Sequence, residues 1–92
     1  MSASGIRTIG VVGLGAMGSG IAQLAIEAGY DTIGREVSDD LGEAARGRIA
    51  HFLQRKVDKE RMTGAERETA LGRLLLTTEL ASFADCDLVI EA

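Results

Sequence analysis

The hydrophobic pattern of the chain separates short apolar runs from longer stretches in which apolar residues recur every three or four positions. The apolar runs predict four strands, at residues 6–12, 30–36, 74–78 and 87–91. The first run is almost continuously apolar, which is typical of a parallel strand that is buried on both faces. The stretches between the runs have the spacing of helices.

Three helices are expected between the first three strands. The first spans residues 16–28 and stops at Gly29, because glycine readily adopts the left-handed conformation that ends a helix. We interpret most of this helix as buried. A narrow solvent-exposed stripe is expected along it, formed by Ser19, Gln23 and Glu27.

The second helix is predicted to begin after Ser38, whose hydroxyl can cap it, with Asp39 and Asp40 near the positive end of the helix dipole. Its core-facing stripe is predicted from apolar residues four positions apart, namely Leu41, Ala45, Ile49, Leu53 and Val57. Thr63 and Glu66 have the spacing of a capping box, so the third helix begins there and continues to about residue 72.

The order strand–helix–strand–helix–helix–strand–strand predicts an α/β fold with a doubly wound parallel sheet and right-handed crossovers. The 92 residues are 46% apolar and 26% charged, as in a globular chain, and the net charge of −4 argues against nucleic acid as a partner. No apolar run approaches the roughly 20 residues of a membrane helix, and the N-terminus has no signal-type apolar core. The single Cys86 excludes an internal disulfide, so a cytoplasmic location is expected.

Three glycines follow the first predicted strand with the spacing G-x-G-x-x-G, namely Gly13, Gly15 and Gly18. In a dinucleotide-binding turn, the first glycine permits the tight turn, the second lets the backbone approach a pyrophosphate, and the third allows close helix packing. The free N–H groups and the dipole of the following helix would face the phosphates. The motif lies between a strand and a helix. It therefore predicts an incomplete Rossmann-type domain over residues 1–92, with a bare structural turn as the alternative.

Glu36 ends the second predicted strand, 18 positions after Gly18. A carboxylate there can accept hydrogen bonds from the ribose hydroxyls of NAD, and its charge repels the 2′-phosphate of NADP. A solvated carboxylate at a strand end is the alternative. The neighbouring Arg35 can accommodate a 2′-phosphate, but successive residues of a strand point to opposite sides. The pattern therefore favours NAD over NADP.

The segment of residues 46–61 has a net charge of +4 within a chain whose net charge is −4. Its acidic residues are Asp58 and Glu60, and its basic residues are Arg46, Arg48, Arg55, Lys56, Lys59 and Arg61. Two interpretations stay open. The segment is either a solvated helix face or an anion site for the phosphorylated handle of a substrate.

No residue of the chain has the setting of a catalytic or metal-binding group. His51 lies in a predicted helix, without Ser, Cys or carboxylate at triad or metal-ligand spacing, and is expected at the surface or the core boundary. Cys86 lies beside the start of a strand expected to be buried, and Met17 lies in the glycine turn, so both are predicted to be packing residues. The catalytic chemistry is therefore expected outside this chain.

The chain resembles the L-3-hydroxyacyl-CoA dehydrogenase family, which includes bacterial 3-hydroxybutyryl-CoA dehydrogenases, in the sequence VGLGAMGSGIAQ of residues 12–23. It also resembles the family in the sequence DCDLVIEA of residues 85–92, the strand before the nicotinamide-side loops. The similarity runs from about residue 6 to residue 92. The 3-hydroxyisobutyrate dehydrogenases share the turn but usually lack both the G-I-A-Q continuation and this strand.

The resemblance implies oxidation of a 3-hydroxyacyl-CoA to the 3-ketoacyl-CoA, as in fatty acid metabolism, with hydride transfer to NAD. Glu36 matches the ribose-binding acid of the family, which is usually Asp, and Ala92 matches a backbone position that lines the cofactor. In the family, the helical hairpin between the second and third strands helps to hold CoA. Lys59 matches a lysine used there, and Phe52 stands where some members have a small polar CoA contact. The pyrophosphate loop is matched by Gly13, Leu14, Gly15, Ala16, Met17 and Gly18.

The same resemblance implies a catalytic His and its orienting Glu beyond the last predicted strand. It also implies a helical C-terminal domain that closes the substrate cleft and forms a homodimer. The full-length protein is thus expected to be an enzyme, and residues 1–92 alone are expected to be inactive. Two alternatives stay open. One is a stand-alone nucleotide-binding or interaction module, and the other is a related dehydrogenase of free hydroxy acids or acyl-carrier-protein thioesters.

Overall fold

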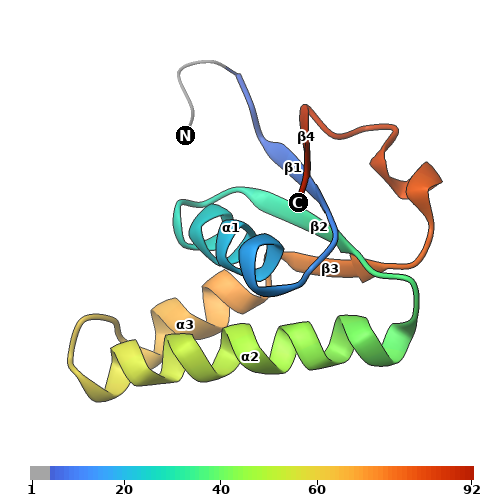
Figure 1. Ribbon diagram of the computed structural model, residues 1–92. Helices are drawn as coiled ribbons and strands as arrows, with labels where there is room; N and C mark the ends of the chain where they lie inside the picture. The colour runs from blue at the N-terminus through green and yellow to red at the C-terminus, as the bar shows by residue number, and fades with distance from the viewer. Residues whose placement is uncertain (1–4) are drawn as a thin grey trace.

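The computed structural model describes residues 5–92, which form a four-stranded parallel sheet with helices (Figure 1). In chain order the elements are β1 (Thr8–Val12), α1 (Ala16–Glu27), β2 (Asp31–Arg35), α2 (Asp39–Asp58), α3 (Gly64–Leu71), β3 (Leu74–Thr77), η1 (Leu80–Phe83) and β4 (Leu88–Glu91). The strand order is β3-β2-β1-β4. The chain builds the sheet from β1 through β2 to β3 and then returns to place β4 on the other side of β1. This reversal is the topology of a Rossmann-type sheet, as predicted.

The predicted strands and helices are all present, with slightly shorter bounds. β1 begins at Thr8 instead of residue 6, and β2 spans Asp31–Arg35 within the predicted residues 30–36. The short 3-10 helix η1 was not predicted, because four residues are too few to show a helical period. None of the helices within residues 5–92 is long and apolar enough to cross a membrane.

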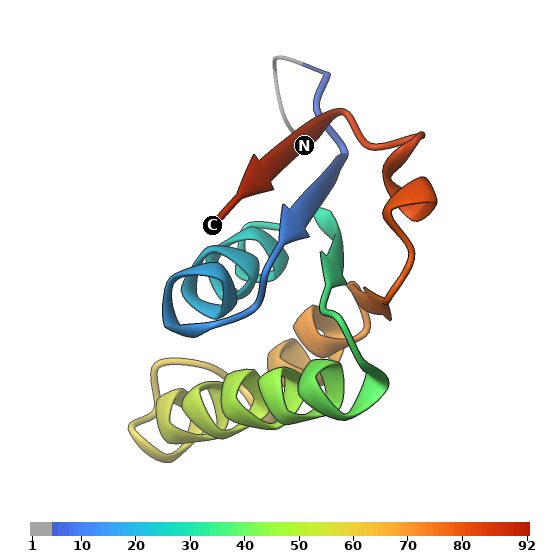
Figure 2. The same cartoon turned by 45° about the vertical axis from the view of Figure 1, so that its right-hand side comes forward.

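The α-helices lie on one face of the sheet and η1 lies on the other (Figure 2). Because side chains alternate along a strand, Ile9 and Val11 of β1 join the core under the helices, whereas Gly10 faces Phe83 of η1. The core under the helices consists of Ile9, Val11, Leu14, Ala22, Ala25, Ile26, Ala45, Ile49, Leu53, Ala70 and Leu74. The face toward η1 is only partly covered by the described residues.

Side chains cap α2 and α3 as predicted. At the start of α2, the hydroxyl of Ser38 accepts a hydrogen bond from the Leu41 N–H at 3.2 Å. At the start of α3, the Glu66 N–H donates to Thr63 Oγ1 at 3.0 Å, and the Thr63 N–H donates to Glu66 Oε1 at 2.8 Å. Gly29 follows α1 with a φ of +100°, which is the expected left-handed stop.

Two predictions about the surface of α1 are wrong. Ser19 is buried instead of solvent-exposed. Its hydroxyl donates a hydrogen bond to the Leu14 carbonyl oxygen at 2.7 Å, so it can be buried without a water partner. The rest of the helix is not uniformly buried, since Met17 is 72% exposed and Leu24 is 68% exposed. No other described element covers that side of α1, so Met17 fills no gap within residues 5–92.

The predicted apolar stripe of α2 is buried only in its middle. At its two ends, Leu41 is 49% exposed and Val57 is half-buried. Residues four positions apart are rotated by about 400°, so the stripe drifts by about 40° per step and leaves the core at both ends. Gly42 is buried in place of Leu41, in van der Waals reach of Leu76 of β3.

Within residues 5–92, β4 lies at the edge of the sheet and pairs with β1. The predicted burial of this strand is not seen in this part of the protein, where Leu88 is 42% exposed and Val89 is 46% exposed. Cys86 precedes this strand and is half-buried, with its Sγ 3.1 Å from the position of a Cβ on Gly10. Burial and the charges of Asp87 and Asp85 raise the pKa of the Cys86 thiol. These observations support the interpretation of Cys86 as a packing residue.

Asp87 ties the start of β4 to the start of β1. Its Oδ2 accepts hydrogen bonds from the N–H groups of Arg7 at 2.8 Å and Thr8 at 3.0 Å. These two bonds hold the pKa of Asp87 below its usual value of 3.8. A carboxylate with a lowered folded-state pKa stabilises the fold above its unfolded pKa, and this contribution is lost as the pH falls through the folded pKa.

We therefore expect Asp87→Asn to lower the melting temperature at neutral pH, because the charged hydrogen-bond acceptor is lost. The difference from wild type should shrink as the pH falls below the ordinary aspartate pKa of 3.8. Thermal unfolding curves over a pH series measure this difference. Asp85→Asn removes the same charge two residues earlier and is the control. An Asp87→Asn effect that does not change with pH would contradict the prediction.

Candidate functional site

The glycine turn lies at the carboxyl end of β1, where the order of the strands reverses. β1 lies between β2 and β4. After β1 the chain forms β2 and β3 on one side of it and then returns to form β4 on its other side. Parallel α/β sheets bind ligands at the carboxyl ends of the strands beside such a reversal. α1 begins at Ala16, directly after the turn, so its first N–H groups point toward this edge.

The three glycines of the turn have different surroundings. Gly13 has a φ of +92°, and a Cβ on it would lie 3.0 Å from the carbonyl oxygen of Ala92. A Cβ on Gly18 would overlap the carbonyl oxygen of Gly13, so α1 packs against the turn only with glycine there. A Cβ on Gly15 would meet nothing within 4 Å. The fold therefore does not require glycine at this position, whereas close approach of a ligand to the backbone would.

The start of α1 is suited to an anion. Side chains cap α2 and α3, but the N-cap of α1 is Gly15, and its first turn contains no acidic residue. The N–H groups of the first turn are left for a ligand, and the helix dipole favours negative charge there. Ala16 and Met17 belong to this turn. These features fit the pyrophosphate of a dinucleotide.

Glu36 binds the turn from the end of β2. Its Oε2 accepts a hydrogen bond from the Leu14 N–H at 2.7 Å, and its Oε1 accepts one from the Val37 N–H at 3.3 Å. A carboxylate has about four acceptor positions, so ribose hydroxyls can bind Glu36 without displacing these bonds. Arg35 reaches the other way, toward the end of β3, where its Nε donates to the Thr78 carbonyl oxygen at 3.1 Å.

Leu14 anchors the turn in the core. Its side chain is 1% exposed and occupies the space over Gly34 of β2, where a Cβ would lie 2.7 Å from Leu14 Cδ1. A glycine inside a strand weakens it, and it also marks the close approach of another group, which is the signal in the sequence for this contact.

Two further residues surround the turn. The Ala92 N–H donates to the Val12 carbonyl oxygen at 3.0 Å, so this backbone lies beside Gly13. Arg48 of α2 donates from Nη2 to the Leu14 carbonyl oxygen at 2.7 Å. No local sequence pattern connects Arg48 with the turn, because 34 positions separate Arg48 from Leu14.

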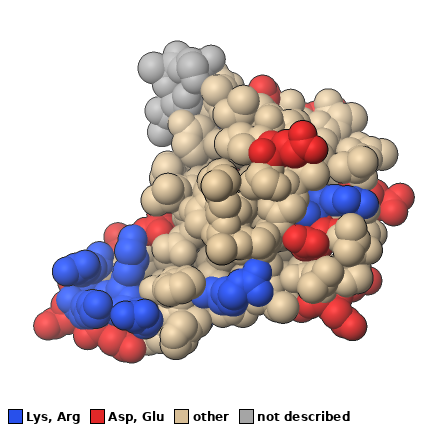
Figure 3. Space-filling model, viewed as in Figure 1, with Lys and Arg blue, Asp and Glu red and all other residues tan. Residues whose placement is uncertain are grey.

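Lys59 lies away from the turn, at the exposed C-terminal cap of α2. α2 has 20 residues and is therefore about 30 Å long. Figure 3 shows basic side chains gathered over the tip formed by the end of α2 and the following loop, with acidic side chains beside them. Within residues 5–92, the basic side chains of the segment that bind other groups are Arg46, Arg48 and Lys56, and those that bind none are Arg55, Lys59 and Arg61.

A pocket of about 310 Å³ lies between α1 and α2, next to the first turn of α1. Its lining residues are Ala16, Ser19, Gly20, Gln23, Arg48 and Phe52. Phe52 is 49% exposed, and the neighbouring His51 is also at the surface, as predicted. Phe52 and Lys59 are seven residues apart. They therefore lie on the same side of α2, about 10 Å from each other along the helix.

A turn that is closed by backbone at Gly13 and Gly18 but open at Gly15 has the form that accepts a dinucleotide pyrophosphate, so fold and site define a dinucleotide-binding domain. The family model of the 3-hydroxyacyl-CoA dehydrogenase NAD binding domain matches residues 8–92. The chain belongs to this family. NAD is its cofactor, as the sequence predicted.

The relatives of this chain are dehydrogenases, and some have known structures. The chain is 43% identical over 83 residues to a probable 3-hydroxybutyryl-CoA dehydrogenase of Deinococcus radiodurans, and the aligned residues make up 90% of this chain and 30% of the relative. It is 45% identical over 87 residues to a 3-hydroxybutyryl-CoA dehydrogenase of Mycobacterium tuberculosis, covering 95% and 30%. The crystal structure of FadB2 from M. tuberculosis matches with a TM-score of 0.92 and 45% identity, again over 95% of this chain and 30% of that chain. The chain thus spans about 30% of the length of these relatives, and the predicted fold class is confirmed.

Gly15→Val is expected to preserve the fold of the full-length protein, because the new side chain enters space that the fold leaves open. It is expected to abolish NAD binding, because the same space is needed for the pyrophosphate to approach the backbone. Calorimetric titration with NAD and a thermal melt measure the two effects. Gly47→Val is the matched control, since a Cβ on Gly47 also meets nothing within 4 Å but lies on α2. Unchanged NAD affinity in a folded Gly15→Val variant would exclude the turn as the pyrophosphate site.

Proposed function

We propose that the full-length protein oxidises an L-3-hydroxyacyl-CoA to the 3-ketoacyl-CoA, with hydride transfer to NAD. The observation that carries the proposal is the match of residues 8–92 to the NAD-binding domain of the 3-hydroxyacyl-CoA dehydrogenases. The relatives named above are 3-hydroxybutyryl-CoA dehydrogenases, which favours a short acyl chain. When it is bound, NAD accepts the hydride.

In this proposal, residues 1–92 form the N-terminal portion of the NAD-binding domain. Glu36 binds the ribose hydroxyls, the backbone at Ala92 lies against the cofactor, and the pyrophosphate is held by Gly13, Leu14, Gly15, Ala16, Met17 and Gly18. The catalytic residues belong to the rest of the protein, together with a helical domain that forms a homodimer. The proposed location is the cytoplasm.

The proposed CoA contact runs along one side of α2. The pocket beside Phe52 has a mainly apolar wall, which suits an uncharged part of the substrate, and Lys59 follows two turns later. Lys59 is exposed, and its ammonium binds no other side chain within residues 5–92, so it is free to pair with a phosphate of CoA. Its place on the helix supports the second of the two interpretations of the basic segment.

The reduction of NAD by the full-length protein tests the proposed reaction. We expect turnover with 3-hydroxybutyryl-CoA and much slower turnover with free 3-hydroxybutyrate or with the acyl-carrier-protein thioester. Faster turnover of the free acid or of the carrier-protein thioester would show that this compound, and not the CoA thioester, represents the substrate class. NAD binding without turnover of any of the three substrates would support the non-catalytic module instead.

Lys59→Ala is expected to lower kcat/KM for the CoA thioester and to leave NAD affinity unchanged. The loss of one partly exposed charge-assisted contact corresponds to roughly 1–3 kcal/mol, and it should shrink as salt rises. Arg61→Ala is the control, because it removes another cation from the same tip that binds no other group within residues 5–92. A short thioester without the nucleotide should show no loss. Equal losses with the short and the full substrate would assign Lys59 a structural role.

Glu36→Gln is expected to reduce the preference for NAD over NADP by about tenfold, or ~1.4 kcal/mol. Glutamine keeps an acceptor for the Leu14 N–H but removes the charge that repels a 2′-phosphate. The ratio of kcat/KM values for the two cofactors measures the preference. Glu36→Asp keeps the charge and should keep the preference. A wild-type protein that already prefers NADP would refute this role of Glu36.

A further inference from the structure

Arg48 reaches from α2 to the glycine turn. Its Nη2 donates to the Leu14 carbonyl oxygen at 2.7 Å and lies 3.4 Å from Ser19 Oγ. Ser19 Oγ itself donates to the same carbonyl oxygen at 2.7 Å. We propose that Arg48 is a positioning residue of the NAD site, which fixes the orientation of the peptide between Leu14 and Gly15.

The planarity of the peptide bond gives this contact its effect. In a trans peptide, the carbonyl of Leu14 and the N–H of Gly15 lie in one plane and point in opposite directions. Arg48 and Ser19 hold the carbonyl oxygen toward the helices, so the Gly15 N–H points away from them. Within residues 5–92 this N–H has no hydrogen-bond partner. It points to the side where the missing Cβ of Gly15 leaves open space.

The turn needs such a constraint because its peptide can otherwise rotate. Glu36 holds the Leu14 N–H and the core holds the Leu14 side chain, but neither contact fixes the peptide that follows. Gly15 has no Cβ, so it adds little resistance to rotation of this peptide. Without Arg48, the Ser19 hydroxyl alone would hold the Leu14 carbonyl. NAD would then have to complete the ordering of the peptide as it binds, and the cost would appear as weaker affinity.

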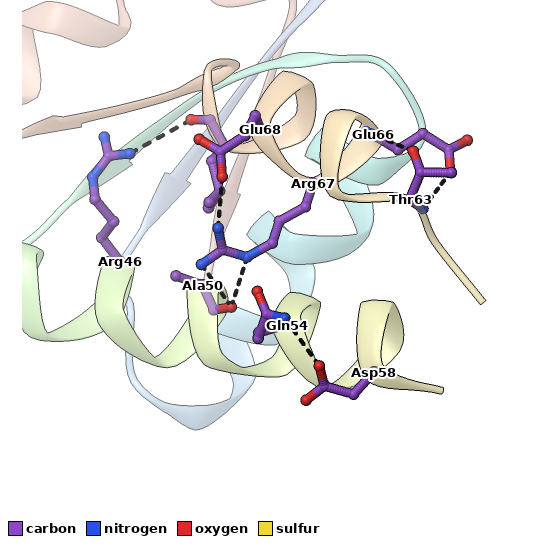
Figure 4. Close-up of polar contacts among 9 residues, drawn as sticks. Arg46, Ala50, Gln54, Asp58, Thr63, Glu66, Arg67 and Glu68 are labelled. Atoms are coloured by element: carbon purple, nitrogen blue, oxygen red, sulfur yellow. Dashed lines mark hydrogen bonds and ion pairs between the residues drawn. The ribbon is translucent and has the colours of Figure 1, made fainter. Parts of the chain in front are cut away.

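Arg46 provides a matched comparison on the same helix. Its Nη2 donates to the Leu74 carbonyl oxygen, also at 2.7 Å, and its Nη1 lies 3.5 Å from the Leu71 carbonyl oxygen. These acceptors belong to the end of α3 and the start of β3. Figure 4 shows Arg46 on α2 with the dashed line that marks one of its hydrogen bonds. The two arginines thus make the same kind of bond, but only Arg48 makes it to the nucleotide turn.

The test compares Arg48→Met with Arg46→Met in the full-length protein. Both variants keep most of the aliphatic stem and lose the bonds of the guanidinium to backbone carbonyls, of which the 2.7 Å bond is common to both, so both are expected to lower the melting temperature. Only Arg48→Met should weaken NAD binding, by about tenfold in calorimetric titrations below both melting temperatures. Arg48→Gln, a milder change with a shorter donor, should show a smaller loss of the same kind. It serves in place of Arg48→Met if that variant does not fold.

A double-mutant cycle with Ser19→Ala separates positioning from general destabilisation. If both side chains act through the Leu14 carbonyl, their effects on NAD affinity are non-additive, whereas Ser19→Ala and Arg46→Met should add. The Arg48→Met loss should also persist near 1 M salt, where the Debye length is about 3 Å. Equal losses of NAD affinity for the two arginine variants would overturn the proposal. So would an unchanged affinity for Arg48→Met, or a loss that disappears at high salt.

Discussion

The packing of Leu14 against Gly34 is the contact on which the nucleotide turn depends. The side chain of Leu14 leaves the turn and enters the core between β2 and the helices, in space that only a glycine at position 34 leaves free. Burial of a leucine side chain contributes about 1.5–3 kcal/mol. A loop that connects a strand to a helix is ordinarily the mobile part of such a unit. Here the loop has a core residue at its centre, so the fold also orders the turn.

The glycine turn combines requirements of the fold with a requirement of the ligand. Gly13 and Gly18 face backbone atoms that cannot move aside, and any side chain at these positions would disturb β1, α1 or the residue after β4. Gly15 faces open space, so its lack of a side chain has no use in the protein alone. This difference is physical support for a nucleotide at the turn, independent of the family relationship.

α2 connects the NAD site with the proposed CoA contact. Near its middle, Arg46 and Arg48 bind backbone carbonyls of other elements, and Lys56 pairs with Glu27 of α1. The charge that these residues contribute to the basic segment is therefore engaged within the fold. Within residues 5–92, the basic residues of the segment that bind no other group lie toward its end, at the tip (Figure 3). One helix thus supports the turn with one part of its length and presents free cations with another.

The sequence by itself determined the order and type of the strands and α-helices, the caps at Ser38 and Thr63, and the turn with its three glycines. All of these depend on residues within a few positions of one another, where periodicity and local hydrogen bonding act. Only the tertiary structure decided that Ser19 is buried and that Gly34 makes room for Leu14. It alone also brought Arg48 to the turn. These outcomes depend on which distant segment lies against each residue, and no local pattern of side chains carries that information.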